Sequence, residues 1–205
     1  MFTVRTAVLS IFLLVAAACT RFSGYAPKAG DVVFQDLESA QGQAVKLATG
    51  SQYTHCGIVF ETNGNFVVYD AVGPVRMIPL QEWIRKGVNR HIVAKRLDTL
   101  RRSLTGETLE QMRQVAERHL GKEYDLVFDW GDDQMYCSEL VWKVYQEGMG
   151  FELTPLRQLG SFRLDHPIVK AKLRERYGDS IPLAQPVVAP SDLFDSENLM
   201  LVYRN

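Results

Sequence analysis

The residue best suited to nucleophilic chemistry is Cys137, which lies where a polar segment passes into an amphipathic helix (132–148, DDQMYCSELVWKVYQEG). Apolar side chains recur after it at helical spacing, and Gly148 is expected to end the helix. Unpaired backbone N–H groups and the helix dipole favour a thiolate there, and the same N–H groups can stabilise an oxyanion. Asp132 and Asp133 would raise the pKa of the thiol if they pointed toward it. The alternative is a small buried cysteine that begins a helix.

A nucleophilic thiolate needs a base, and the best placed of the four histidines is His55 in YTHCGIVF. It begins an apolar strand, where a rigid sheet edge would hold the ring in place. The other three histidines are expected at the start of a strand, the end of a helix and a loop (His91, His119 and His166). Asp70, in VVYDAVGP on the next predicted strand, can reach His55 by antiparallel pairing and orient the ring. A role as a turn residue is the alternative for Asp70.

The elements that must position these residues follow from periodicity and turn signals. Asn-Gly between two apolar runs predicts a hairpin at residues 63–64. Antiparallel strands come first and helices flank them, which predicts an α+β fold. No linker divides residues 28–205, so we expect a single domain there. Strands are expected at 31–37, 54–61, 65–73, 91–98 and 199–205, and helices at 38–49, 79–87, 105–121, 137–148 and 166–178.

The N-terminus is interpreted as a targeting segment rather than part of the fold. The apolar run 7–18 would cover only about 18 Å as a helix, too short to span a bilayer. A signal peptide at 1–18 is the better interpretation, followed by a tether at 19–27. Ala16–Ala18 followed by Cys19 is similar to a bacterial lipobox, although Ala16 stands where Leu is usual. We expect lipidation of Cys19 and, because Thr20 follows, an outer-membrane lipoprotein facing the periplasm; plain cleavage and secretion remain the alternative.

Composition and cysteine content narrow the chemistry. The net charge of −1 offers no basic surplus for nucleic acid. With Cys19 lipidated, Cys56 and Cys137 remain, and these two could form one disulfide or Cys137 could stay free. Cys56 should point to the strand face opposite His55, as a buried core residue. His55, Cys56 and Cys137 are too few ligands for a structural zinc site, and their spacing matches no zinc motif. The sequence also has no glycine-rich phosphate-binding loop, so we expect no cofactor.

Four segments in one order resemble a known family. YTHCGIVF, YDAVGPVRMIPLQEWI, GKEYDLVFDW and YCSELVWKVYQ are together similar to the permuted papain-like amidases of the YiiX/YaeF type, a branch of the NlpC-like cysteine hydrolases. The resemblance covers about residues 27–195. It implies a circularly permuted papain-like fold in which an antiparallel sheet packs against the helix that bears the nucleophile.

The resemblance also implies roles for individual residues. Cys137 would be the nucleophile and His55 the general base and acid, and Asp70 would occupy a position where the family often has Glu, one methylene longer. Gly121 and Tyr124 match a G-x-x-Tyr pattern, with Tyr124 thirteen residues before Cys137, which implies a hydroxyl near the oxyanion. A packed core tyrosine is the alternative.

Three functions stay open at this point. The first is an exported cysteine peptidase or amidase that acts on peptidoglycan peptides or related amino-acyl compounds. The second is a lipid-directed acyl hydrolase or acyltransferase that uses the same Cys137–His55 pair on a lipid-like substrate. The third is a non-catalytic envelope lipoprotein. In all three, lipid on Cys19 would attach the protein to the membrane.

Overall fold

The computed structural model describes residues 24–100 and 102–205. The predicted signal peptide at 1–18 and the predicted lipidation site at Cys19 lie outside the described residues, as does most of the predicted tether at 19–27. These three remain predictions from the sequence.

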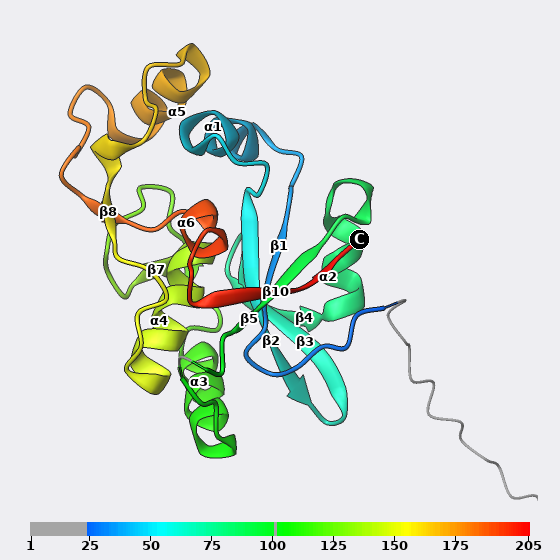
Figure 1. The fold of residues 1–205 in the computed structure, drawn as a ribbon. Helices are drawn as coiled ribbons and strands as arrows, with labels where there is room; N and C mark the ends of the chain where they lie inside the picture. The colour runs from blue at the N-terminus through cyan, green and yellow to red at the C-terminus, as the bar shows by residue number, and fades with distance from the viewer. Residues whose placement is uncertain (1–23, 101) are drawn as a thin grey trace, which may run out of the picture.

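A six-stranded antiparallel sheet forms the centre of the molecule (Figure 1). Its order is β10-β5-β1-β2-β3-β4, so the first and last strands of the described chain belong to one sheet. This confirms the predicted α+β class with antiparallel pairing. The strands are β1 (Val32–Gln35), β2 (His55–Thr62), β3 (Asn65–Ala71), β4 (Val75–Pro79), β5 (Val93–Leu97) and β10 (Leu199–Arg204).

Two successive hairpins build the half of the sheet that presents His55 and Asp70. Asn63 and Gly64 both adopt positive φ, 51° and 74°, which is the geometry of a tight turn between β2 and β3. A second hairpin joins β3 to β4, a strand that the periodicity did not predict. Only Val75 is buried in β4, because the strand lies at the sheet edge, and this leaves little alternation to detect.

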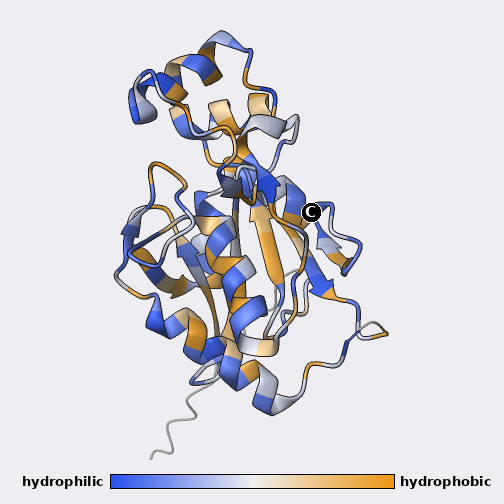
Figure 2. Cartoon of the chain, turned by 90° about the vertical axis from the view of Figure 1, so that its left-hand side faces the viewer, coloured by the Kyte–Doolittle hydropathy of each residue, from blue (hydrophilic) through white to orange (hydrophobic). Residues whose placement is uncertain are grey.

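Helices cover both faces of the sheet, and a lobe formed by α1 and α5 lies beyond one end of it (Figures 1 and 2). α4 packs against β2 and β3 and is covered in turn by α3, whereas α2 packs against β3 and β4. The predicted helices therefore form, with ends shifted by a few residues. They are α1 (Ala40–Thr49), α2 (Leu80–Lys86), α3 (Gly106–Arg118), α4 (Cys137–Met149) and α5 (Pro167–Tyr177). A short helix that the sequence did not predict, α6 (Pro190–Phe194), follows near the C-terminus.

The position of α4 is set by nearly complete burial. Leu140 and Val144 are fully buried against the sheet, and the Tyr145 hydroxyl donates a hydrogen bond to the Gly30 carbonyl at 2.6 Å. Gly148 was expected to end this helix, which is wrong. The helix continues to a left-handed cap at Gly150, and Gly148 is instead the point where α4 touches α3: a Cβ there would lie 2.6 Å from the Met112 Cα.

Short elements complete the chain around the start of α4. β6 and β7 pair in parallel on either side of a loop, and β8 pairs with β9 in antiparallel fashion. Strands of two residues are too short to show an alternating pattern, so the sequence did not predict them. They are β6 (Glu123–Tyr124), β7 (Gln134–Met135), β8 (Arg157–Gln158) and β9 (Pro186–Val187), with 3-10 turns at Val88–Arg90 and Leu159–Ser161.

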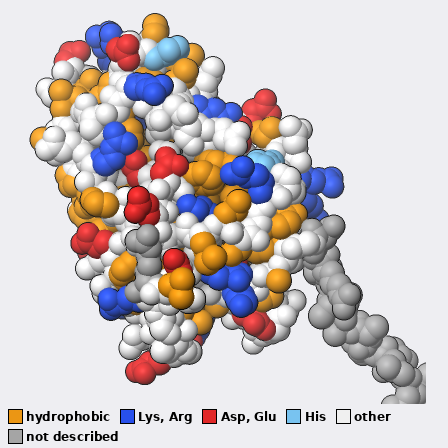
Figure 3. Space-filling view, in the orientation of Figure 1, with side chains coloured by type: hydrophobic (Ala, Val, Ile, Leu, Met, Phe, Trp, Pro, Cys, Tyr) orange, Lys and Arg blue, Asp and Glu red, His pale blue; other side chains and the backbone are white. Residues whose placement is uncertain are grey.

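The surface mixes both signs of charge. On the face shown in Figure 3, Lys and Arg side chains are interspersed with Asp and Glu among neutral and hydrophobic ones. Within the described ranges, no helix is both long and apolar enough to cross a membrane.

Candidate active site

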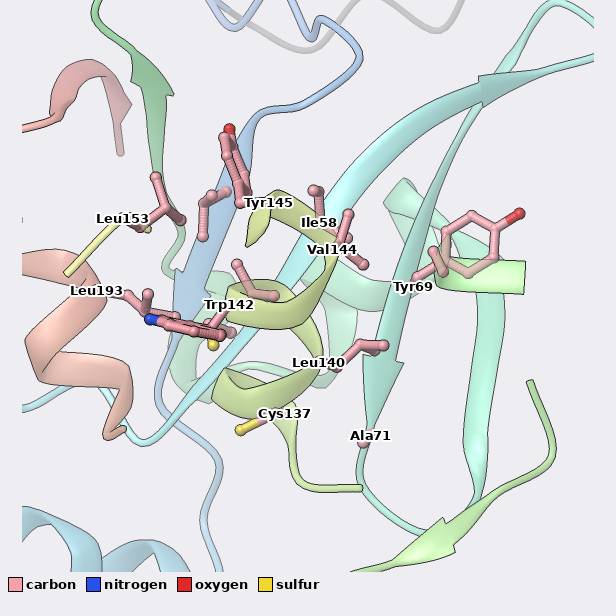
Figure 4. Packing of buried hydrophobic residues seen from close by; sticks show 14 of the residues in the cluster. Ile58, Tyr69, Ala71, Cys137, Leu140, Trp142, Val144, Tyr145, Leu153 and Leu193 are labelled. Atoms are coloured by element: carbon pink, nitrogen blue, oxygen red, sulfur yellow. The ribbon is translucent and has the colours of Figure 1, made fainter. Parts of the chain in front are cut away.

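Cys137 is the first residue of α4 and lies at the edge of the main hydrophobic cluster (Figure 4). It is a free thiol with 6% of its surface exposed. The first backbone N–H groups of α4 have no acceptor within the helix, and their positive dipole ends favour a thiolate at this position. Asp132 does not oppose this effect, because its exposed carboxylate pairs with Lys143 at 2.8 Å, and Asp133 is exposed as well.

His55 lies between Asp70 and Cys137. Its Nε2 is 2.9 Å from Asp70 Oδ2, and both side chains are buried. The ring also hydrogen-bonds the Cys137 side chain, and because Nε2 faces Asp70, this contact falls to Nδ1. The structure therefore brings together the three residues that the sequence selected, from β2, β3 and the start of α4.

Asp70 is held by two further donors that the sequence analysis missed. Arg76 donates from Nε to Oδ1 at 2.8 Å and from Nη2 to Oδ2 at 3.2 Å, and the Trp83 indole N–H donates to Oδ2 at 3.0 Å. Trp83 is fully buried and stacks on the His55 ring at 5.7 Å. Burial opposes ionisation of Asp70, but His55 and Arg76 outweigh it and lower its pKa to about 2.

The local chain geometry explains why an aspartate suffices here. Asp70 pairs directly with Arg76 across the β3–β4 hairpin, so strand register alone delivers the guanidinium. On the other side, Gly57 has no side chain: a Cβ there would lie 2.4 Å from Val68 Cγ1 and 3.4 Å from the Asp70 Cβ. The close approach of β2 to β3 lets the shorter carboxylate reach His55.

The Cys137 thiolate and the His55 imidazolium stabilise each other. A hydrogen bond from Cys56 and the charge of His55 lower the pKa of Cys137 well below its usual value, although burial opposes this. Burial lowers the pKa of His55, but the Cys137 thiolate and Asp70 outweigh it and raise the value to about 9. The favoured state at neutral pH is thus a thiolate beside an imidazolium.

Cys56 contacts the Cys137 sulfur, which its expected role as a buried core residue did not indicate. It is a free, fully buried cysteine on the α4 face of the sheet, opposite in direction to His55, as the strand alternation predicted. It also hydrogen-bonds the Cys137 sulfur through its side chain and its backbone N–H. Burial and the Cys137 charge raise the pKa of Cys56 well above the usual value, so Cys56 stays a protonated donor.

Tyr124 lies beside Cys137 and is oriented by a relay from α5. Arg176 donates to Gln41 Oε1 at 2.9 Å, and Gln41 Nε2 donates to the Tyr124 hydroxyl oxygen. Burial and the nearby Cys137 thiolate raise the pKa of Tyr124, so the hydroxyl keeps its proton and can donate it toward Cys137. The sequence selected Tyr124 but not Gln41 or Arg176.

A cavity of about 110 Å³ reaches Cys137 and Tyr124 from the side opposite the sheet core. It lies between the α1–α5 lobe and the start of α4, and most of its wall is hydrocarbon. The wall residues come from segments far apart in the chain, which is why no local pattern indicated it.

Comparisons with known proteins agree with the fold and with the predicted family. The model of the family described as "Permuted papain-like amidase enzyme, YaeF/YiiX, C92 family" matches residues 26–203. The uncharacterized protein YiiX of Escherichia coli K12 is 40% identical over 198 residues, which are 97% of this chain and 94% of YiiX. The crystal structure of yiiX from Escherichia coli O157:H7, which is described as a metalloprotein, has a TM-score of 0.84 and 42% identity, covering 88% of this chain and 99% of its own.

Proposed function

Because the chain belongs to the permuted papain-like amidase family of YaeF and YiiX, whose members are cysteine peptidases and amidases, we propose that Cys137 is the nucleophile of a Cys-His-Asp triad. His55 would act as general base and acid, and Asp70 would orient its ring. The observation that supports this best is the position of His55, with Nε2 on Asp70 and the opposite edge of the ring on Cys137.

The first half of the reaction forms a thioester. The Cys137 thiolate attacks the amide carbonyl carbon, and the carbonyl oxygen becomes an oxyanion. The backbone N–H of Cys137, at the start of α4, and the Tyr124 hydroxyl would donate hydrogen bonds to it. His55 Nδ1–H then protonates the leaving nitrogen, the C–N bond breaks, and a free amine departs while the acyl group stays on Sγ.

The second half returns the enzyme to its resting state. Neutral His55 accepts a proton from water, and the resulting hydroxide equivalent attacks the thioester carbonyl. The C–S bond breaks, a carboxylic acid leaves, and the thiolate–imidazolium pair forms again. Asp70 keeps the His55 ring in one orientation through both halves, and Arg76 and Trp83 hold Asp70 from the far side.

A metal has no step in this mechanism, although the related yiiX of Escherichia coli O157:H7 is described as a metalloprotein. Across residues 24–100 and 102–205, no three side chains of His, Cys, Asp or Glu are grouped to hold a metal ion. The possible metal ligands nearest the nucleophile already have other partners, since His55 hydrogen-bonds Asp70 and the Cys56 thiol donates a hydrogen bond to the Cys137 sulfur. This donor set does not fit a metal site.

The compartment and substrate class rest on the sequence. The signal peptide at 1–18 and the lipobox-like residues before Cys19 support export and a lipid anchor in the bacterial envelope, facing the periplasm. Peptide-like or amino-acyl compounds of the cell wall are the amides that we expect the enzyme to cleave there. Expressed in a Gram-negative host, the full chain should be found in the membrane fraction, and Cys19→Ala should move it to the soluble fraction. If Cys19→Ala stays with the membrane as Cys56→Ala does, the anchor is refuted.

Thiol labelling tests the nucleophile without knowledge of the substrate. At pH 6, iodoacetamide should alkylate the wild type rapidly at Cys137, because an ordinary thiol is protonated there whereas Cys137 is a thiolate. Cys137→Ala should lose rapid labelling, and Cys56→Ala should keep it. Equal labelling of the wild type and Cys137→Ala would refute the assignment.

A further inference from the structure

Two thiols from distant parts of the chain lie in contact beside the active site. Cys56 comes from β2 and Cys137 begins α4, and both are free cysteines of the main hydrophobic cluster. The Cys56 thiol donates a hydrogen bond to the Cys137 sulfur, so the two side chains point at each other, as the two halves of a disulfide must. Cys19 lies outside the described residues. Within the described residues, Cys56 is therefore the thiol that can reach Cys137.

Strand register holds Cys56 against Cys137. The pairing of β2 with β3 begins only at Ile58 and Tyr69, so β3 does not pair with the backbone of Cys56. The Cys56 backbone N–H donates to the Cys137 sulfur instead. On its other side, Cys56 is opposite Phe34 in the continuous pairing of β2 with β1. The sheet itself thus fixes the position of Cys56 beside the Cys137 sulfur.

The two sulfurs differ in access and in protonation. Cys137 lines the cavity of about 110 Å³ described above, whereas Cys56 is fully buried and does not line it. A small oxidant that enters the cavity meets Cys137 first. Cys137 is also the thiolate of the pair, and the oxidation of cysteine follows thiolate character and access. It follows that an oxidant attacks Cys137, and that Cys56 is placed to react with the product.

We propose that Cys137 and Cys56 form an oxidation site for hydroperoxides, in which Cys56 converts the oxidised nucleophile into a Cys56–Cys137 disulfide. The disulfide blocks catalysis, because the Cys137 sulfur is no longer free to attack a carbonyl. It also protects this sulfur from further oxidation to sulfinic acid, which is irreversible, and a thiol reductant restores the free pair. The proposal rests on the reactive Cys137 thiolate of the proposed function, but not on the identity of the substrate.

Two steps convert the thiol pair to the disulfide. In the first, the Cys137 thiolate attacks one oxygen of hydrogen peroxide, the O–O bond breaks, and the leaving hydroxide takes a proton from the His55 imidazolium to become water. In the second, the Cys56 sulfur attacks the Cys137 sulfenic acid, the S–O bond breaks, and the departing hydroxide takes the Cys56 proton as a second water. The two sulfurs together lose two electrons, and the peroxide is reduced to two molecules of water.

Oxidation of Cys137 also makes Cys56 easier to ionise. Burial raises the pKa of Cys56 most, and the hydrogen bond to Cys137 and the negative charge of Cys137 raise it further. The sulfenic acid is neutral, so this charge disappears once Cys137 is oxidised. The Cys56 thiol can then lose its proton as it attacks.

Hydrogen peroxide tests the site on the reduced full chain. A few equivalents are added at neutral pH, and the intact mass, a non-reducing peptide map and the labelling of Cys137 by iodoacetamide are recorded. The wild type should lose the mass of two hydrogen atoms, yield a pair of peptides joined through Cys56 and Cys137, and lose its rapid labelling. Dithiothreitol should then return the labelling to its starting level. Cys19→Ala should behave in the same way, because that thiol takes no part.

Cys56→Ser is the matched variant, because it keeps a hydrogen-bond donor beside Cys137 and removes only the second thiol. Rapid iodoacetamide labelling before peroxide shows that the variant is folded with its thiolate intact. After peroxide, its Cys137 should gain two oxygen atoms as sulfinic acid, and dithiothreitol should restore less than about a tenth of the labelling. In Cys137→Ala, Cys56 should stay reduced, since it is buried and protonated. If Cys56→Ser fails to fold, Cys56→Ala takes its place.

The outcomes distinguish this proposal from the proposed function. Sulfinic acid at Cys137 in the wild type, a disulfide between two chains, or recovery of labelling in Cys56→Ser as complete as in the wild type overturns the oxidation site. Rapid labelling of the reduced enzyme leaves the nucleophile standing in each of these cases. If the reduced wild type fails to label rapidly at Cys137, the nucleophile is refuted, and the oxidation site with it.

Discussion

The two sides of Cys137 differ in polarity. On the sheet side, the sulfur faces His55, and behind it lies Asp70, which receives hydrogen bonds from Arg76 and Trp83. On the lobe side, the same sulfur borders a cavity whose wall is nearly all hydrocarbon. One side consists of charged and polar groups joined by hydrogen bonds, and the other offers a substrate mainly apolar contacts.

This difference separates two tasks. In the proposed mechanism the charged side stabilises the thiolate and moves a proton, so changes there should alter the rate and the pH dependence for every substrate alike. The apolar side holds none of the His55–Asp70 pair, so changes there should alter the choice among substrates more than the proton transfer. The predictions below test the charged side, from the largest expected effect to the smallest.

His55→Ala should have the largest effect, because it removes both the proton donor and the partner of the thiolate. We expect hydrolysis of an amino-acyl 4-nitroanilide, whose leaving amine must be protonated, to fall by about 10³-fold or more. His166→Ala, at the exposed start of α5, should keep wild-type activity. A variant with a few per cent of the activity would contradict the role of His55.

Asp70→Asn should reduce kcat by about 10²-fold and narrow the active pH range. The wild type should lose activity as the pH rises through about 9, because His55 then loses the proton that the leaving group needs. Asp70 is one of the groups that raise this pKa, so the neutral amide should move the alkaline limit to lower pH. Asp70→Glu keeps the charge, and its alkaline limit should stay near that of the wild type. An unmoved limit in Asp70→Asn would refute the interaction.

Arg76→Met should move the same limit in the opposite direction. Its guanidinium opposes the charge of Asp70, so its removal should raise the pKa of His55 and shift the alkaline limit upward. We expect kcat to fall by about tenfold or less, because Trp83 still holds the carboxylate. The pH–rate profile measures this, with Arg76→Lys as the control that keeps the charge. A shift to lower pH would contradict this account of the charges.

Cys56→Ala should have the smallest effect on rate at neutral pH and a distinct effect in acid. The Cys56 hydrogen bond lowers the pKa of Cys137, so its loss should raise that pKa and move the acid limit of alkylation to higher pH. Cys56→Ser retains a donor, and its acid limit should stay close to the wild-type one. The pH dependence of iodoacetamide labelling would show this, and coincident curves for wild type and Cys56→Ala would argue against the contact.

Local sequence patterns predicted those parts of the site whose position is set by a single helix start or a single hairpin. Cys137 is recognisable because an amphipathic period begins at it, and the Asn63–Gly64 turn places the strand of Asp70 beside that of His55. The signal for Arg76 was also local, since Gly73 and Pro74 indicate a turn that would set Arg76 opposite Asp70, but the edge strand that follows alternates too weakly to reveal it.

The sequence by itself indicated the α+β class and selected Cys137, His55 and Asp70, which the structure brings together, because helix starts, strand alternation and tight turns are properties of short segments. Only the tertiary structure decided what surrounds them. Trp83 reaches Asp70 because α2 packs on β3, and Gln41 meets Arg176 across 135 residues of chain. The hydrocarbon cavity exists because α5 closes over α1 beside the start of α4, and packing between distant segments leaves no period in the sequence.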